Sequence, residues 1–341
     1  MGSYVGLDVS DKETAICVID EAGEKRWEGK VTTTPGLLVK RLREHAPDAC
    51  KIGLETGPLC VWLWHELNEA GFPVVALHAR HAAAALSLQT NKNDKNDAAG
   101  LARLVRSGWY RAVVVKSMQV HRLRTLLATR DHLVGVSTGL INRIRGTLKT
   151  FGVVLGQGHG GTFERKVRSA LPADPMVAKL IESMLALWQT IQRQKRDIDN
   201  ELARVVRQDS VLRLLTTVPG VGPVTAISFA TAVGDPTRFR RSRDVAAYLG
   251  LTPKQYQSGE VNISGRISKC GDRLTRKLLF EAATVVLLRS RAPTALKEWG
   301  LGIAARSGTW KARVAIARKL ATVLHRMWIS NQTFQAYPTA A

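Results

Sequence analysis

The chain has 341 residues, enough for two or three domains, and 45% of them are apolar, which excludes an intrinsically disordered protein. Fifty lysines and arginines stand against 28 aspartates and glutamates, a formal net charge of +22 that favours a polyanionic partner such as DNA or RNA. The four cysteines have no paired CxxC spacing, so the sequence indicates neither a zinc site nor a disulfide framework.

The first part of the chain alternates short apolar runs with turn-forming residues, followed by helical periodicity. Strands are predicted at residues 4–9, 13–19, 27–32, 51–55 and 73–77. Helices are predicted at 37–45 and 59–70, and a further helical stretch runs from Asp94 through Val105. The order βββαβαβα is that of the RNase H-like fold, and by this analogy residues 8 and 55 lie on adjacent central strands.

Four acidic residues fall where such a fold would gather them into a metal site. Asp8 and Glu55 each end an apolar strand, and ligands of open α/β sheets favour the carboxyl ends of strands. Asp94 and Asp97 are three residues apart, so they share one face of a helix. Mg²⁺ prefers oxygen ligands, and two such ions can hold both oxygens of a phosphoryl displacement. Each acid alone is an ordinary cap or solvated charge, as Asp11 is in the turn after the first strand; the combination indicates a metal site.

The middle of the chain is predicted to be a helical arm. Apolar periodicity gives one long basic helix at about 120–151 and a second at about 175–206, separated by a Gly-rich break at 152–161. Two long helices around a loop favour an antiparallel coiled coil. Oligomerisation, nucleic-acid contact and a plain spacer are all compatible with this pattern.

The C-terminal part is predicted to hold much of the nucleic-acid surface. From Arg207 onward there are 21 lysines and arginines against 7 aspartates and glutamates, a net charge of +14. Val218–Gly222 connects two predicted helices in the manner of a helix-hairpin-helix, where Gly220 and Gly222 either contact a phosphate or only form the turn. A basic cluster follows at Arg238, Arg240, Arg241 and Arg243.

Four further motifs in the C-terminal part complete a recognisable series. The series is G-L-D at 6–8, L-E-T-G at 54–57, D-x-x-D at 94–97, P-G-V-G at 219–222, G-L-T-P at 250–253, S-G at 258–259, G-R-I-S-K-x-G at 265–271 and A-R-K-L at 317–320. Over nearly its whole length the chain resembles the insertion sequence 110 family of transposases, including its 1111 subgroup and the Piv-type DNA invertases. The resemblance implies a transposase that recombines DNA for a mobile element.

The resemblance also implies an organisation and a chemistry. It implies a RuvC-like catalytic domain at 1–118, a coiled-coil arm at 119–206 and a mainly helical C-terminal transposase domain at 207–341. Asp8, Glu55, Asp94 and Asp97 would form the DEDD tetrad that binds Mg²⁺, or Mn²⁺ in its place. Ser258 would attack the DNA phosphate and become covalently linked to the strand. A bridge RNA would pair with target and element DNA, and dimers on each DNA would assemble into a tetramer with composite active sites.

Several alternatives stay open at this point. Without the resemblance, Ser258 is an ordinary turn residue, and Ser264 and Ser268 are nearby alternative serines. The further candidate nucleic-acid contacts are Lys254, Arg266, Lys269 and Arg273. The competing functions are a nuclease of Holliday-junction-resolvase type in which water attacks, and a non-catalytic nucleic-acid-binding protein. No apolar stretch of membrane-spanning length and no signal peptide is found, so we expect no membrane partner and a cytoplasmic protein that associates with the nucleoid when active.

Overall fold

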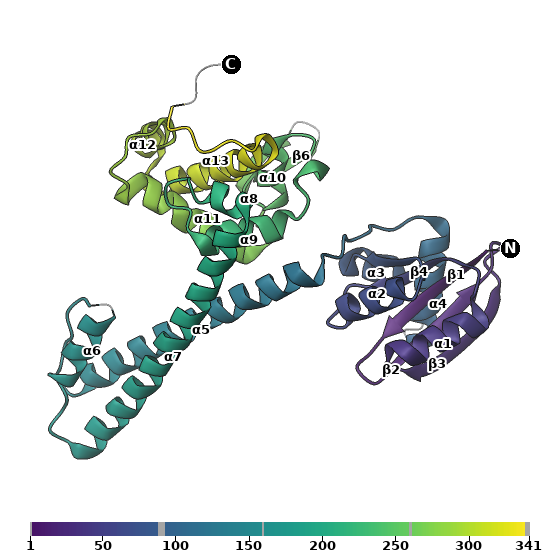
Figure 1. Cartoon of the computed structure of the whole chain (residues 1–341), viewed down its shortest axis with the longest axis horizontal. Helices are drawn as coiled ribbons and strands as arrows, with labels where there is room; N and C mark the ends of the chain where they lie inside the picture. Colours follow the sequence, from purple (N-terminus) through teal and green to yellow (C-terminus); the bar gives the residue numbers. More distant parts are fainter. Residues whose placement is uncertain (1, 88–92, 159, 259–260, 338–341) are drawn as a thin grey trace. The chain divides into compact units, whose positions relative to one another are not determined.

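The computed structural model describes residues 2–87, 93–158, 160–258 and 261–337. The chain forms two compact units, Met1–Ser117 and Met118–Ala341. In Figure 1 the first unit is coloured purple to blue and the second from blue-green to yellow. The first is a mixed α/β unit and the second is mostly helical, as the sequence predicts. The two long helices predicted as an arm belong to the second unit.

The N-terminal unit is built on one five-stranded sheet (Figure 1). Its strands are β1 (Ser3–Val9), β2 (Glu13–Ile19), β3 (Lys25–Thr32), β4 (Ala49–Glu55) and β5 (Val74–Leu77). They lie in the order β3-β2-β1-β4-β5. The first three form an antiparallel meander, whereas β4 runs parallel to β1 and β5 runs parallel to β4. Strand β1 is therefore central, with an antiparallel neighbour on one side and a parallel one on the other.

Helices cover both faces of this sheet, because alternate residues of each strand point to opposite sides. The helices are α1 (Pro35–His45), α2 (Cys60–Glu69), α3 (Ala79–Leu86) and α4 (Asp94–Ser107). On one face Val5 and Leu7 pack with buried leucines of α1 and α2. On the opposite face Ala98 and Ala102 of α4 pack against β2 at Cys17. Helix α4 thus lies on the side of the sheet away from α1 and α2.

Helix α3 was not predicted from the sequence. Five of its eight residues are alanines, which favour a helix by intrinsic propensity but give little apolar contrast between faces. Only Ala82 is buried within it. A prediction based on apolar periodicity therefore finds no row of large apolar side chains along one face of this helix.

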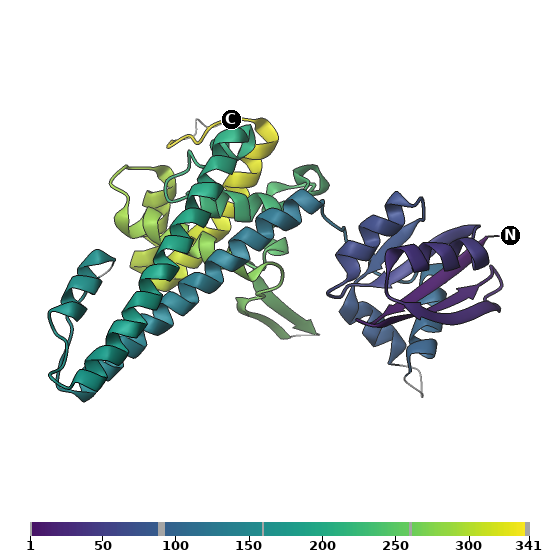
Figure 2. The same cartoon turned by 60° about the horizontal axis from the view of Figure 1, so that its bottom comes forward.

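The second unit begins with two long antiparallel helices, which lie side by side in Figures 1 and 2. These are α5 (Met118–Thr150) and α7 (Pro175–Gln208). Arg130 of α5 donates to Asp199 of α7 at 2.5 Å, and Gln192 of α7 donates to Ser137 of α5 at 2.7 Å. The two pairs are seven residues apart in opposite chain directions, which is the heptad spacing of a coiled coil. Both helices begin and end within two residues of their predicted bounds.

A short helix closes the far end of this pair. Helix α6 (Gly161–Arg168) contributes Phe163 and Val167 to a cluster with Ile144, Trp188 and neighbouring apolar residues of α5 and α7. The Phe163 and Trp188 rings meet edge to face at 5.5 Å. The arm therefore has its own hydrophobic core at this end, separate from the main core of the unit.

The rest of the second unit is a helical body with one β-ribbon. Its elements are α8 (Ser210–Leu215), α9 (Pro223–Val233), η1 (Pro236–Arg238), α10 (Ser242–Tyr248), β6 (Pro253–Ser258), β7 (Val261–Ile267), α11 (Arg273–Thr284), the π-helical turn η2 (Val285–Arg289), α12 (Ala295–Ser307) and α13 (Thr309–Ser330). The fully buried Phe229 of α9 and Leu320 of α13 belong to its core. Among the described residues, no helix combines the length and the apolar character needed to cross a bilayer.

Candidate functional site

The ends of β1 and β4 place two carboxylates next to each other. Gly6 pairs with Gly53, and Leu7 with Leu54, in the parallel register between these strands. Asp8 and Glu55 are the next residues along, and both are partly buried. Because side chains two apart on a strand share a face, Asp8 lies on the face of Gly6, and Glu55 lies on the face of Gly53. Both carboxylates are therefore on the face that α4 covers, at the carboxyl edge of the sheet.

The paired glycines let α4 approach that face closely. A Cβ atom at Gly6 would lie 2.0 Å from the carbonyl oxygen of Ala98 and 2.5 Å from the nitrogen of Ala102. A Cβ atom at Gly53 would lie 2.7 Å from a methyl carbon of Val105. These distances leave no room for a side chain, so the backbone of α4 rests directly on β1. The contact fixes the helix whose first turn carries the other two acids.

Lys30 connects the first turn of α4 to the strand position that lies level with Asp8 across the sheet. Asp8 pairs with Ala15 across β1 and β2, and Ala15 pairs with Lys30 across β2 and β3. The Lys30 ammonium donates to the Asp94 carboxylate at 2.5 Å. This hydrogen bond and, after it, the charge of Lys30 lower the pKa of Asp94. The same hydrogen bond raises the pKa of Lys30, and the charge of Asp8 adds to that rise. Asp94 is the first residue of α4, after the N-cap Asn93, and Lys30 links it to the strand position beside Asp8. The sequence analysis did not identify Lys30 as part of the candidate site.

Asp8, Glu55 and Asp94 lie at this edge of the sheet, and Asp97 lies in the first turn of α4 with Asp94, but the four side chains do not converge on one point. Within the described part of the chain, no three His, Cys, Asp or Glu side chains are close enough to hold a metal ion. Carboxylates gathered at one point repel each other unless a cation lies between them, and Asp94 is paired with Lys30. The donor set fits a hard divalent cation, since all four side chains offer carboxylate oxygens.

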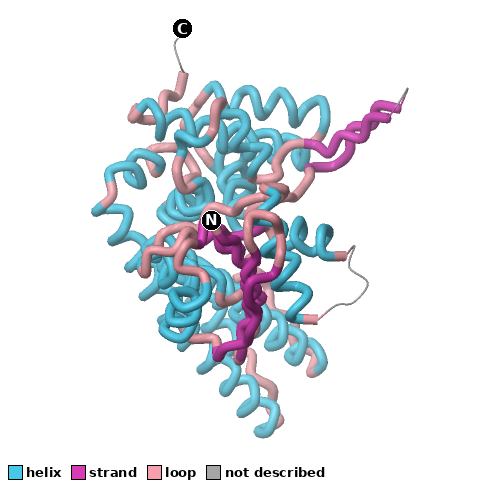
Figure 3. Tube along the Cα trace, turned by 90° about the vertical axis from the view of Figure 1, so that its right-hand side faces the viewer, coloured by secondary structure: helices cyan, strands magenta, loops and turns pink. Residues whose placement is uncertain are grey.

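Ser258 lies at the end of an exposed two-stranded ribbon. Strands β6 and β7 pair antiparallel, with Ser258 opposite Val261. All six residues of β6 are exposed, and the ribbon extends away from the helices of its unit in Figures 2 and 3. Gly259 and the side chain of Ser264 lie outside the described residues. Without the family resemblance, Ser258 is predicted to be an ordinary turn residue. In the structure it is the exposed last residue of strand β6.

The root of the ribbon is held by two glycines. Gly250 and Gly271 adopt φ of +70° and +74°, a region that favours glycine. A Cβ at Gly250 would lie 2.2 Å from the Cys270 carbonyl oxygen, and one at Gly271 would lie 2.2 Å from the Tyr248 carbonyl oxygen. The segments before β6 and after β7 therefore pack backbone against backbone. Arg276 joins them by donating to the carbonyl oxygens of Leu249 and Cys270, at 3.1 and 2.5 Å.

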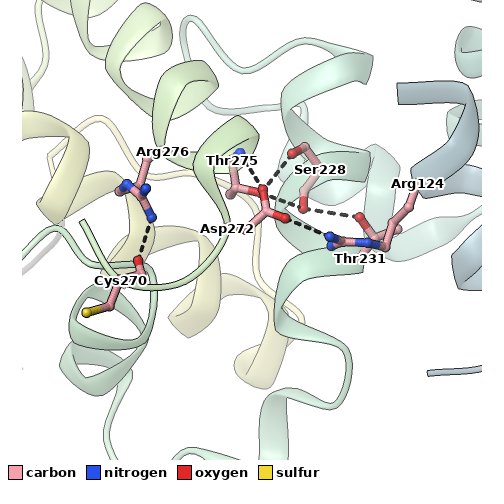
Figure 4. Close-up of polar contacts among 7 residues, drawn as sticks. All are labelled: Arg124, Ser228, Thr231, Cys270, Asp272, Thr275 and Arg276. Carbon is pink, nitrogen blue, oxygen red and sulfur yellow. Dashed lines mark hydrogen bonds and ion pairs between the residues drawn. The ribbon is translucent and has the colours of Figure 1, made fainter. Parts of the chain in front are cut away.

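Asp272 connects this root to the long helix α5 (Figure 4). It caps α11 by accepting from the backbone N–H of Thr275 at 2.8 Å, and it pairs with Arg124 of α5 at 2.8 Å. The Thr275 hydroxyl in turn donates to the carbonyl oxygen of Ser228. Burial raises the pKa of Asp272, but the hydrogen bonds from Thr275 and the charge of Arg124 outweigh it, so that the pKa is lowered. The D-x-x-T spacing of a helix cap could have identified Asp272 from the sequence.

We expect Asp272→Asn to destabilise the second unit at neutral pH, because asparagine keeps the helix cap but loses the charge that faces Arg124. A hydrogen bond to a charged group contributes roughly 1.5–3 kcal/mol to the free energy of unfolding. Because the folded pKa is below the ordinary value of 3.8, this stability is present above that pH and is lost as the pH falls through the folded pKa. Urea midpoints of the two proteins should therefore differ at pH 7 and converge in acid; a difference that persists unchanged in acid would contradict this account.

The remaining predicted contacts are exposed basic residues of the second unit. They are Arg238, Arg240, Arg241, Arg243, Lys254, Arg266, Lys269 and Arg273. Arg238 lies over the Tyr248 ring at 4.4 Å. His325 of α13 is buried and positions this region: its Nε2 donates to the Pro236 carbonyl oxygen at 2.9 Å, and its Nδ1 is hydrogen-bonded to the Ser242 hydroxyl at 3.0 Å. In the described residues none of the eight basic side chains is paired with a carboxylate.

The two glycines of P-G-V-G have different environments. Gly220 adopts φ of +82°, and a Cβ there would lie 2.7 Å from the Ala282 carbonyl oxygen of α11, so helix packing alone requires this glycine. Gly222 is exposed at the N-cap of α9, with no atom within 4 Å of an added Cβ. Gly222 is therefore the more exposed of the two, since Gly220 is half-buried.

Comparison with known families covers both the segment that holds the four acids and the segment that holds the ribbon. A family model described as transposase, for the DEDD domain of IS110 elements, matches residues 5–152 and spans the four acids. A model of the IS116/IS110/IS902 transposase family matches residues 212–299 and spans the ribbon. The chain belongs to this transposase family. The transposase is therefore an enzyme of DNA transposition, and its DEDD domain implies a divalent metal.

Individual relatives agree with this assignment. The transposase is 29% identical over 340 residues to the transposase for insertion sequence element IS1111A of Coxiella burnetii, covering 97% of this chain and 91% of that one. It is 27% identical over 290 residues to a probable family 20 transposase of Pseudomonas aeruginosa, covering 83% and 85%. It is 32% identical over 123 residues to the pilin gene-inverting protein of Moraxella bovis, covering 36% and 38%.

Proposed function

We propose that this transposase cleaves and rejoins DNA through a covalent bond between Ser258 and a DNA phosphate, and that its carboxylate edge acts on the same phosphate. The observation that carries the proposal is the exposed position of Ser258 at the end of β6, on a ribbon whose root is tightly packed. A nucleophile that must reach a phosphate within DNA needs such an accessible and well-supported position. The order of the five strands further supports an RNase H-like assignment for the N-terminal unit.

The proposed reaction conserves the phosphodiester. The Ser258 oxygen forms a bond to phosphorus and gives up its proton, while the bond from phosphorus to one deoxyribose oxygen breaks and that oxygen takes up a proton. The strand is then held as a phosphoserine ester. Attack by a deoxyribose hydroxyl of another strand reverses these changes and releases the serine, so strands are rejoined without a high-energy cofactor.

The four acids would hold Mg²⁺, with Mn²⁺ as a substitute. Asp8, Glu55, Asp94 and Asp97 offer only carboxylate oxygens, on the face and edge of the sheet described above. A divalent ion bound there would neutralise charge that develops on the phosphate. Lys30 holds the Asp94 carboxylate at the start of α4 and adds a positive charge beside Asp8. The exposed basic residues of the second unit would bind the flanking phosphates.

We further propose that a bridge-type RNA directs this reaction and that dimers assemble into a tetramer. Both proposals come from the family resemblance. The net charge of +22 is in keeping with binding two nucleic acids at once. The antiparallel pair of α5 and α7, with its own core at the far end, offers a stiff element for assembly. Sequence choice would then lie in base pairing with the RNA rather than in side chains.

The proposal is tested by mixing the purified protein, its co-purifying RNA and an element-end DNA with Mg²⁺. We expect a protein–DNA adduct on a denaturing gel that disappears in Ser258→Ala and after removal of Mg²⁺ by a chelator. Ser268→Ala is the matched control and should form the adduct, because Ser268 lies at the root of the ribbon, where its backbone N–H donates to Thr252.

Two other results would overturn the proposal. Cleavage without an adduct, unchanged in Ser258→Ala, would show that water attacks, as in a nuclease of resolvase type. DNA and RNA binding without any cleavage, under conditions in which the element is mobile in cells, would show a binding protein without catalysis.

A further inference from the structure

The ribbon has two chemically different faces. Tyr256 pairs with Ile263 across the two strands, and Ser258 follows Tyr256 by two residues. Because residues two apart on a strand share a face, Tyr256, Ile263 and Ser258 lie on the same side of the ribbon. Gln257 pairs with Asn262 on the opposite side, which is therefore polar. The proposed nucleophile thus stands on the apolar face.

This apolar face is uncovered by the protein itself. Tyr256 is 66% exposed and Ile263 is 60% exposed, although both are large hydrophobic side chains. The two strands carry Lys254 and Arg266, both exposed, and no carboxylate; Glu260, which joins them in the sequence, lies outside the described residues. An exposed apolar pair framed by positive charge is poorly suited to another basic protein surface. It suits a nucleic acid, which combines apolar base faces with a negative backbone.

We propose that Tyr256 and Ile263 pack against a base of the DNA strand beside the phosphate that Ser258 attacks, and so position that phosphate. This inference rests on the proposed function of Ser258. Two residues along a strand span roughly 6.6 Å, and bases follow one another at about 3.4 Å along one DNA strand. Tyr256 would therefore meet a base about two nucleotides or fewer from the phosphate. The contact is independent of sequence, because every base has a flat apolar face.

The shape of the β-ribbon also suits binding to DNA. A two-stranded β-ribbon is narrow enough to enter the major groove of DNA. Proteins that bind the minor groove insert apolar side chains at a base step and so unstack its bases, and Tyr256 and Ile263 would act on a base step in the same way. At a cleavage point, such unstacking would expose the backbone to Ser258 while Lys254 and Arg266 contact neighbouring phosphates. Tyr256 is then a positioning residue, because it acts on the strand through the base.

The test uses the full chain with its co-purifying RNA and the Ser258→Ala substitution, so that the DNA stays uncleaved. Element-end DNA carries 5-iodouracil at single positions within three nucleotides of the cleaved phosphate, and irradiation crosslinks it to an adjacent aromatic side chain. We expect a crosslink that mass spectrometry assigns to Tyr256. We also expect Tyr256→Ala to raise the Kd for this DNA by roughly 5- to 150-fold, as for loss of one base stack. Tyr256→Phe, which keeps the ring, should bind like the parent.

Gln257→Ala is the matched control on the opposite face and should leave the Kd unchanged. An equal Kd for Tyr256→Ala and the parent, with no crosslink at any position, would overturn the inference while leaving the adduct at Ser258 intact. A change in sedimentation of the protein with Tyr256→Ala, without a change in DNA binding, would instead assign this face to contact between copies of the chain. A crosslink to Tyr256 in the Ser258→Ala protein, together with no adduct in the parent protein, would place the ribbon on DNA but refute the proposed nucleophile.

Discussion

Asp8→Asn is expected to abolish strand cleavage while the protein stays folded. Asparagine has nearly the same shape as aspartate but lacks the negative charge that attracts a divalent cation. Asp8 is the next-to-last residue of the central strand β1, level with Glu55 of β4, and its charge contributes to raising the pKa of Lys30. Loss of several kcal/mol of charge stabilisation corresponds to a fall of roughly 10³-fold or more in the cleavage rate, measured on labelled element-end DNA.

Asp11→Asn provides the matched control, because it makes the same chemical change three residues away in an exposed turn. It should cleave at the parental rate. Binding of RNA and DNA should survive in Asp8→Asn, since the exposed basic residues of the second unit are unchanged, and Mn²⁺ binding followed by electron paramagnetic resonance should weaken. If RNA binding were lost to the same extent as cleavage, the assignment of Asp8 as a metal ligand would be wrong.

Gly6→Ala is expected to loosen α4 from the sheet. The new methyl group would lie 2.0 Å from the Ala98 carbonyl oxygen, which is backbone and cannot move without shifting the helix. Overpacking of this kind destabilises a fold by roughly 1–3 kcal/mol. Hydrogen exchange of the full chain should therefore accelerate in peptides covering β1 and α4. Cleavage should also fall by about 10²-fold, because the shift displaces Asp94 and Asp97 from the strand that carries Asp8.

The matched control is Gly36→Ala in α1, where no atom lies within 4 Å of the added Cβ. Alanine in a helix is more stable than glycine by roughly 0.5–1 kcal/mol, so this variant should exchange no faster than the parent. Exchange in α4 that is equally slow in Gly6→Ala and the parent would mean that the helix can move away from β1 without cost, contrary to the close contact described here.

The sequence predicted the strands of the N-terminal unit well because each is a short apolar run bounded by turn residues. It also placed Asp8 and Glu55 near the ends of two strands, and the order of strands in an RNase H-like fold makes those two strands neighbours. It could not predict that Gly6 and Gly53 are paired, because a glycine within a strand has no periodicity of its own. Nor could it find Lys30, whose role depends on three strands lying in one register.

The ribbon was harder to predict for a different reason. A strand that is exposed on both faces lacks the alternation of buried and polar residues by which strands are recognised. Residues around Ser258 therefore look like a turn, and the family resemblance alone singled the serine out. The contact of Asp272 with Arg124 joins residues 148 positions apart, and no local pattern encodes that distance.

The two helices of the arm also limit how its length can change. Arg130 faces Asp199 and Ser137 faces Gln192, so these two contacts between α5 and α7 are seven residues apart on each helix. Removing seven residues from only one helix would bring unmatched side chains together along the rest of the pair. Removing seven from both would restore the pattern and shorten the arm by about 10 Å. Relatives or engineered variants with arms of different reach should therefore differ by matched heptads, with the tip and the root left unchanged.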